Sequence, residues 1–248
     1  NEAILNSYNG DRSTENFQNF LTYAKRVFFS NGIHHHYAED KFVPEIPQEY
    51  FVELIKNSDV KQLPLAENET VDEFLAFITP IVFDKDLYAT RRSGNDDIIR
   101  NSATNFYKGD LSKEEVEQFY DAQREPEDLT PISYGLNSQL VKENGKIYEN
   151  VYKSGGLYGE VIDQIIFWLE KANLVAENDT QRNYTQLLID YYKTGDLNLW
   201  DDYNVAWVQD SVSMIDYVNG FIEDYGDPMG MKATWEAVVN FKDLEATK

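Results

Sequence analysis

The stretch MIDYVNGFIEDY (residues 214–225), followed by GDPMG (residues 226–230), decides the fold class. Its β-branched and aromatic residues predict a strand, and the segment rich in Gly and Pro predicts a turn at the end of that strand. It is the clearest strand in the sequence. The stretch TWEAVVNF (residues 234–241), beyond the turn, is compatible with a helix. We therefore expect a minor β element in a mainly helical chain.

Most of the remaining sequence has helical periodicity with recognisable ends. From Thr14 onward apolar residues recur at i, i+3 and i+4, and Asn31 with Gly32 supplies a left-handed stop. Capping boxes begin at Thr70 and Ser112, and Pro47 suits the first position of another helix. Further helices are expected over residues 158–176 and 180–193, and short extended pieces over 41–45 and 145–148, although 145–152 equally fits the start of a helix. The predicted fold class is α+β, mainly helical.

Composition excludes several classes of protein. The 248 residues carry a formal net charge of -22, which opposes binding to nucleic acid or to an anionic membrane surface. There is no cysteine, so disulfides and thiolate chemistry are excluded, and no stretch approaches the ~20 apolar residues of a membrane span. No repeat or long linker interrupts the chain, so we expect residues 1–248 to form one compact region with no confident internal boundary. We expect a cytoplasmic location, although the lack of cysteine fits reducing and oxidising compartments alike.

The three histidines of the chain are consecutive, at His34, His35 and His36. In an extended segment the first and third would share a face, but zinc usually takes three or four ligands from separated positions. A polar turn or strand edge after a helix is the preferred interpretation. An HExxH zinc motif cannot occur, because no histidine has a second one four residues away.

An acidic segment begins at Asp196 and continues through Asp201 and Asp202. It faintly resembles a calcium loop, but it lacks the central glycine and the final glutamate. We therefore interpret it as a solvated acidic turn. The neighbouring aromatic residues, Trp200, Tyr203 and Trp207, are predicted to be core residues.

Glu223 and Tyr225 lie two residues apart at the end of the predicted strand, which would place them on one face. A carboxylate and a phenol held together could bind the terminal ammonium of a peptide and polarise a carbonyl. From these residues alone, an ordinary exposed strand end is the simpler explanation.

Four stretches resemble a known family: NGIHHHY (residues 31–37), KFVPE (41–45), TPISYGLN (130–137) and, most specifically, GFIEDYGDPMG (220–230). They are similar to dipeptidyl peptidase III, a family of zinc exopeptidases that release dipeptides from the free amino end of short peptides. The histidine-containing version resembles the bacterial branch of that family. The resemblance implies two lobes around a wide cleft, with this chain as the amino-terminal part of the lobe that does not hold zinc.

The resemblance also implies roles for three residues. Glu223 matches the carboxylate that receives the amino terminus of the substrate, Tyr225 the tyrosine that hydrogen-bonds near the scissile amide, and Glu236 an acidic residue lining the substrate subsites. The zinc ligands would lie beyond Lys248, so zinc is expected only in the parent enzyme and the isolated chain is expected to be inactive. Its expected partners are short peptide substrates and the zinc-bearing lobe.

An alternative of a different class is a standalone acidic domain that binds or scaffolds a partner protein. A reading frame that continues past Lys248 into a zinc signature would support the peptidase, and a stop codon there would support the alternative.

Overall fold

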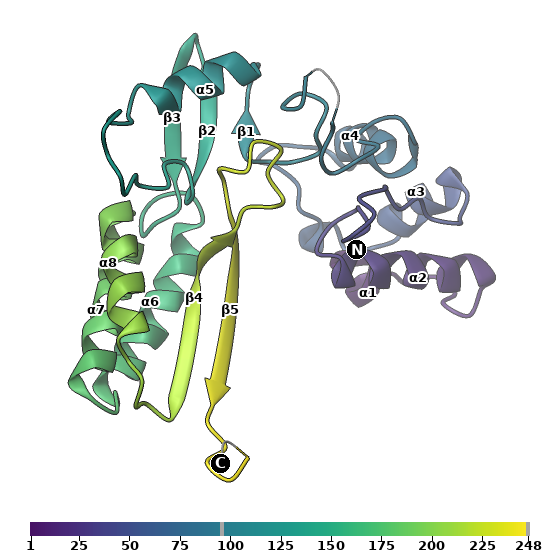
Figure 1. The fold of residues 1–248 in the computed structure, drawn as a ribbon. Coiled ribbons are helices and arrows are strands. Elements are labelled where there is room, and N and C mark those ends of the chain that lie inside the picture. The colour runs from purple at the N-terminus through teal and green to yellow at the C-terminus, as the bar shows by residue number, and fades with distance from the viewer. Residues whose placement is uncertain (95–96, 247–248) are drawn as a thin grey trace. The chain divides into compact units, whose positions relative to one another are not determined.

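The structure is a computed structural model that describes residues 1–94 and 97–246. Residue contacts divide the chain into two compact units (Figure 1). Unit 1 contains residues 1–92 and 101–103, and unit 2 contains the described residues of 93–100 and 104–248. From the sequence we predicted one compact region with no confident internal boundary, and no shift in composition accompanies the division of contacts.

Unit 1 is built from helices. They are α1 (Glu2–Ser7), α2 (Glu15–Phe29), α3 (Gln48–Lys56) and α4 (Val71–Phe83), with a short 3-10 helix η1 (Val60–Gln62). Thr14 caps α2 by accepting a hydrogen bond from the amide of Phe17, and Thr70 forms the predicted capping box with Glu73. Pro47 is the N-cap of α3, one position before the one predicted. The core of the unit is formed by the buried faces of these helices, including Phe20 and Leu54.

Unit 2 contains further helices beside its strands. They are α5 (Lys113–Asp121), α6 (Gly159–Leu174), α7 (Asp179–Thr194) and α8 (Leu197–Val208). The prediction of an acidic turn at residues 196–202 was wrong, because this segment starts α8 with Asp196 as its N-cap. Trp200 and Tyr203 are buried on that helix, as predicted for core aromatics.

Two small sheets complete unit 2. In the first, β1 (Tyr107–Lys108) runs parallel to β2 (Ser138–Glu143), which pairs antiparallel with β3 (Lys146–Val151). The second is an antiparallel hairpin of β4 (Ile215–Glu223) and β5 (Thr234–Phe241) that lies alongside α6, α7 and α8 (Figure 1).

The hairpin confirms one prediction and corrects another. Residues 214–225 do contain the predicted strand, but residues 234–241 form its partner strand and not a helix. Trp235, Ala237 and Val239 alternate along β5 and line a groove with α6, which shows the two-residue period of a strand. Residues 146–151, left open between strand and helix, form β3. The predicted class, α+β and mainly helical, is confirmed.

Across the described residues 1–94 and 97–246, no helix combines the length and the apolar character needed to cross a membrane.

Candidate functional site

The candidate site lies where the β4–β5 hairpin meets the loop of residues 224–233. Gly220 of β4 pairs with Glu236 of β5, but Glu223 pairs with Thr234, so β4 has one extra residue and a bulge between Phe221 and Glu223. Directly paired residues share a face of an antiparallel sheet, as do residues two apart on one strand. The bulge therefore turns Glu223 to the face that carries Glu236.

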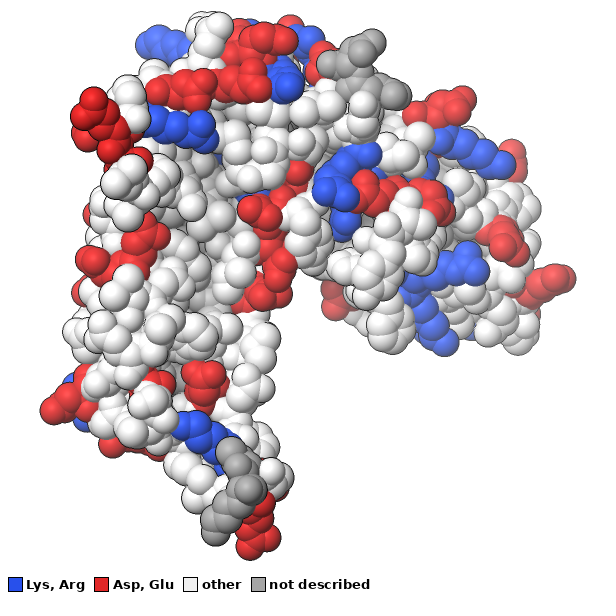
Figure 2. Space-filling view, in the orientation of Figure 1, with Lys and Arg blue, Asp and Glu red and all other residues white. Residues whose placement is uncertain are grey.

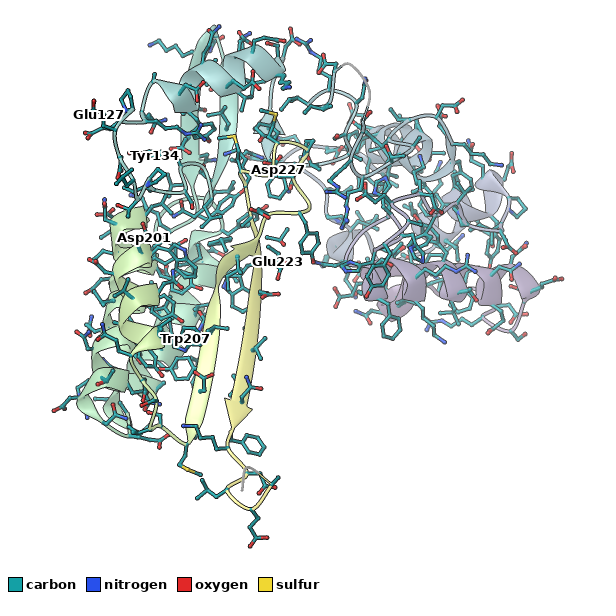
Figure 3. All side chains as sticks on the ribbon, viewed as in Figure 1. Glu127, Tyr134, Asp201, Trp207, Glu223 and Asp227 are labelled. Carbon is teal, nitrogen blue, oxygen red and sulfur yellow. The ribbon has the colours of Figure 1, made fainter. Side chains whose placement is uncertain are left out.

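Glu223 pairs with Thr234, two residues before Glu236, so the two carboxyl groups are neighbours on one face of the hairpin. Partial burial raises the pKa of Glu223 above its ordinary value, and the charge of the neighbouring Glu236 raises it further. Glu223 projects from the end of β4 in Figure 3, and Figure 2 shows acidic side chains gathered at this end of the hairpin. The structure thus brings together two carboxyl groups that the resemblance had singled out separately.

Tyr225 does not share the strand with Glu223. The strand ends at Glu223, and Tyr225 lies in the following turn with 46% of its surface exposed. The prediction that the two residues lie side by side on one strand was therefore wrong, because the bulge and the turn interrupt the alternation on which it relied. The predicted exposure of Tyr225 is confirmed.

A glycine at position 220 allows β4 to pack closely on α8. A Cβ atom at this position would lie 2.4 Å from Cη2 of Trp200, closer than real side chains approach. The next residue, Phe221, is buried against the ring of Tyr152 at a centroid distance of 4.9 Å. Aromatic packing at these two successive positions therefore holds the strand that carries Glu223.

The loop after β4 is held by Asp227, which is only 2% exposed and is labelled in Figure 3. One of its carboxylate oxygens accepts hydrogen bonds from the amides of Met231 and Lys232, both at 2.9 Å, and from the hydroxyl of Tyr107 at 2.9 Å. The other oxygen accepts from the amide of Met229 at 3.2 Å. Sequence reasoning missed this anchor, although an Asp inside a Gly- and Pro-rich turn is a typical side-chain acceptor for backbone amides.

Lys232 was also missed by sequence reasoning. Its side chain is fully buried, and its ammonium donates a hydrogen bond to the hydroxyl of Tyr120 at 2.6 Å. Burial lowers the pKa of Lys232 to about 8, although the charges of Glu149 and Asp227 act in the opposite direction. No local pattern distinguishes this lysine from an exposed one.

The histidine segment in unit 1 forms a polar turn, as interpreted from the sequence. Nε2 of the buried His34 donates to the backbone oxygen of Tyr88 at 2.7 Å, and burial lowers the pKa of His34. Nδ1 of His35 accepts from the amides of Tyr37 and Ala38. Within residues 1–94 and 97–246, no three His, Asp or Glu side chains are grouped to hold a metal ion.

Comparison with known proteins places this site in a family context. Residues 133–248 match the model of peptidase family M49, a range that includes Glu223, Tyr225 and Glu236. The chain is 26% identical over 255 residues to human dipeptidyl peptidase 3, covering 91% of this chain and 34% of that protein. It is 23% identical over 256 residues to dipeptidyl peptidase 3 of Dictyostelium discoideum, covering 94% and 34%. The chain thus spans about a third of the length of these relatives.

Two solved structures are also similar. DPP III from Caldithrix abyssi superimposes with a TM-score of 0.48 and 20% identity, over 96% of this chain and 41% of that one. Dipeptidyl-peptidase III from Corallococcus sp. strain EGB gives a TM-score of 0.46 and 21% identity, over 64% and 28%. The family match over residues 133–248 and the sequence relatives confirm that this chain resembles dipeptidyl peptidase III.

Proposed function

We propose that this chain supplies substrate recognition to a zinc-dependent dipeptidyl peptidase that releases dipeptides from the amino end of short peptides. The observation that carries the proposal is that Glu223 and Glu236 lie on one face of the β4–β5 hairpin, near enough for the charge of Glu236 to raise the pKa of Glu223. The family match over residues 133–248 supports the same class of reaction.

A pair of carboxyl groups suits a free amino terminus better than a single one does. When both groups are ionised they repel each other, which is one reason that the pKa of Glu223 is raised. A peptide ammonium brings a positive charge and three N–H donors, so it relieves the repulsion and forms charge-assisted hydrogen bonds. An N-acylated peptide offers neither, and the site would select peptides with a free amino end.

The fixed position of the carboxyl pair would also select which peptide bond is cleaved. A carboxylate pair fixed on a strand holds the amino end of the substrate at a set distance from the reacting amide, which selects the second peptide bond over the first or third. In this proposal Glu223 and Glu236 are the substrate-binding residues. Tyr225, on the exposed turn that follows, is the catalytic residue that donates its hydroxyl to a carbonyl near the scissile bond.

Zinc, when bound in the parent enzyme, would polarise the scissile carbonyl and activate water. The described residues 1–94 and 97–246 do not fit that metal, since no three His, Asp or Glu side chains among them are grouped to hold it. The metal is therefore assigned to the lobe expected as partner, and the isolated chain is expected to have no peptidase activity.

The test is an NMR titration of the chain with a short alanine peptide amide and with its N-acetylated form. We expect the free-amine peptide alone to shift the side-chain carboxyl signals of Glu223 and Glu236, and Glu223→Gln to weaken binding about tenfold or more. Glu160→Gln, an exposed glutamate on α6 in the same unit, is the matched control and should bind as the unmodified chain does.

Equal binding of both peptides, or of the Glu223→Gln variant, would reject the proposal. The alternative of a standalone scaffolding domain stays a prediction, and it would be favoured if neither peptide shifted these signals.

A further inference from the structure

The ammonium of Lys232 is enclosed by polar groups from several elements of unit 2. It donates to the hydroxyl of Tyr120 at 2.6 Å, to the backbone oxygen and the hydroxyl of Ser138 at 3.1 Å each, and to the backbone oxygen of Gly135 at 3.3 Å. It also lies 5.6 Å from the ring centre of Tyr107. Lysine is almost never fully buried unless it is paired, so this site is built around the charge.

The charge is balanced through two hydroxyl groups. Tyr120 donates to a carboxylate oxygen of Glu149 at 2.9 Å, and Ser138 donates to the same oxygen at 2.5 Å. Both hydroxyls therefore accept from the ammonium and donate to the carboxylate. This network connects α5, β2 and β3 to a single residue of the loop.

The backbone at Lys232 is held as firmly as its side chain. Its amide donates to Asp227, and the amide of Ala233 donates to the backbone oxygen of Leu136 at 2.9 Å. β5 begins at the next residue, Thr234, which pairs with Glu223, and Glu236 follows two positions later. A displacement of Lys232 would therefore move Glu236, which lies only four residues further along the chain.

We propose that Lys232 is a positioning residue that fixes the start of β5, and through it the spacing between Glu236 and Glu223. The inference rests on the proposed function, because the spacing between Glu223 and Glu236 matters only if the two residues bind the peptide. Recognition groups need support from a rigid surrounding shell, since small displacements cost large factors in binding and rate. Lys232 provides that support without facing the substrate, because its side chain is fully buried.

The test is the titration of Glu223, observed by NMR of carboxyl-labelled glutamate, in three variants of the chain. Lys232→Met removes the ammonium and keeps a flexible apolar stem. Tyr120→Phe keeps the ammonium and the ring but deletes one hydroxyl contact. Leu188→Ala, in a fully buried position of α7, destabilises the same unit without touching the network, and it controls for loss of stability alone.

If Lys232 positions the pair, the pKa of Glu223 falls toward its ordinary value in Lys232→Met and, to a smaller extent, in Tyr120→Phe, because the two carboxyl groups separate. Loss of a positive charge alone would raise the pKa, so the direction of the change distinguishes the two effects. Leu188→Ala should leave the titration unchanged. Should Lys232→Met fail to fold, Tyr120→Phe carries the same test.

A pKa of Glu223 that stays constant or rises in the folded Lys232→Met and Tyr120→Phe variants would overturn the inference, as would an equal fall in Leu188→Ala. Peptide binding is measured separately, with the free-amine peptide amide. If Glu223→Gln binds the peptide unchanged, the proposed function fails while the titration still decides the role of Lys232. If the proposed function and the positioning role of Lys232 are both correct, the Lys232→Met variant should bind the peptide about tenfold more weakly than the unmodified chain.

Discussion

Replacing Lys232 with methionine is expected to change how the free energy of unfolding of unit 2 depends on pH. In the native state the pKa of Lys232 is about 8, whereas an unfolded lysine titrates near its ordinary value of 10.5. Between these two values the unfolded chain binds more protons than the native chain does. The native state should therefore gain stability from this group as the pH rises through 8.

The size of the effect follows from the pKa difference. One pKa unit corresponds to about 1.4 kcal/mol, so the full shift amounts to about 3 kcal/mol, of which about 2 kcal/mol would be recovered between pH 7 and 9.5. The titratable groups that face the ammonium are Glu149, Asp227, Tyr107 and Tyr120. Burial raises the pKa of both tyrosines above their ordinary value of 10, so their titration is moved away from this range.

The assay is urea unfolding followed by tryptophan fluorescence at pH 7, 8.5 and 9.5. All four tryptophans lie in unit 2, at positions 168, 200, 207 and 235, so the signal excludes unit 1 and its titrating groups. Relative to Lys232→Met, the unmodified chain should gain about 2 kcal/mol over this range. Identical pH dependence in the two proteins would refute the assignment of a charged, buried Lys232.

Three further outcomes are expected. In the zinc-dependent parent enzyme that we propose, Glu223→Gln should raise KM and lower kcat/KM about 10- to 150-fold, and Tyr225→Phe should lower kcat about 10²- to 10³-fold with zinc content unchanged. Steady-state kinetics and metal analysis check both variants. Activity within about twofold of the unmodified enzyme would contradict the two roles. Gly220→Ala should destabilise unit 2 by about 1 to 3 kcal/mol through overpacking against Trp200, which tryptophan-monitored unfolding measures; an unchanged midpoint would contradict the close approach. Thr70→Ala should destabilise unit 1 by about 1 kcal/mol, because it removes a capping box, and hydrogen exchange of the α4 amides would detect this; unchanged protection there would contradict it.

Local signals in the sequence predicted local structure well. Thr70 and Ser112 were placed correctly as helix caps, because a capping hydrogen bond spans only three residues. The left-handed Asn31 after α2 was predicted for the same reason. These features depend on neighbours in the chain and need no knowledge of the tertiary fold.

Features that depend on residues far apart in the sequence could not be predicted from local patterns. Residues 234–241 fit a helix or a strand equally, and only their pairing with β4 decides between the two. The bulge at Phe221 sets the face on which Glu223 lies, and no residue type marks it in the sequence. Lys232 looks like any surface lysine until the groups contributed by residues 120, 135 and 138 surround it.

The most direct test of the proposed recognition site is the pKa of Glu223 with and without ligand, measured by NMR of carboxyl-labelled chain. The account predicts that a short peptide amide with a free amino end lowers this pKa, because its ammonium stabilises the charged carboxylate against the repulsion of Glu236. The N-acetylated peptide should leave the pKa unchanged. A pKa of Glu223 that responds equally to both peptides, or to neither, would contradict the claim that this carboxyl pair binds the amino terminus of the substrate.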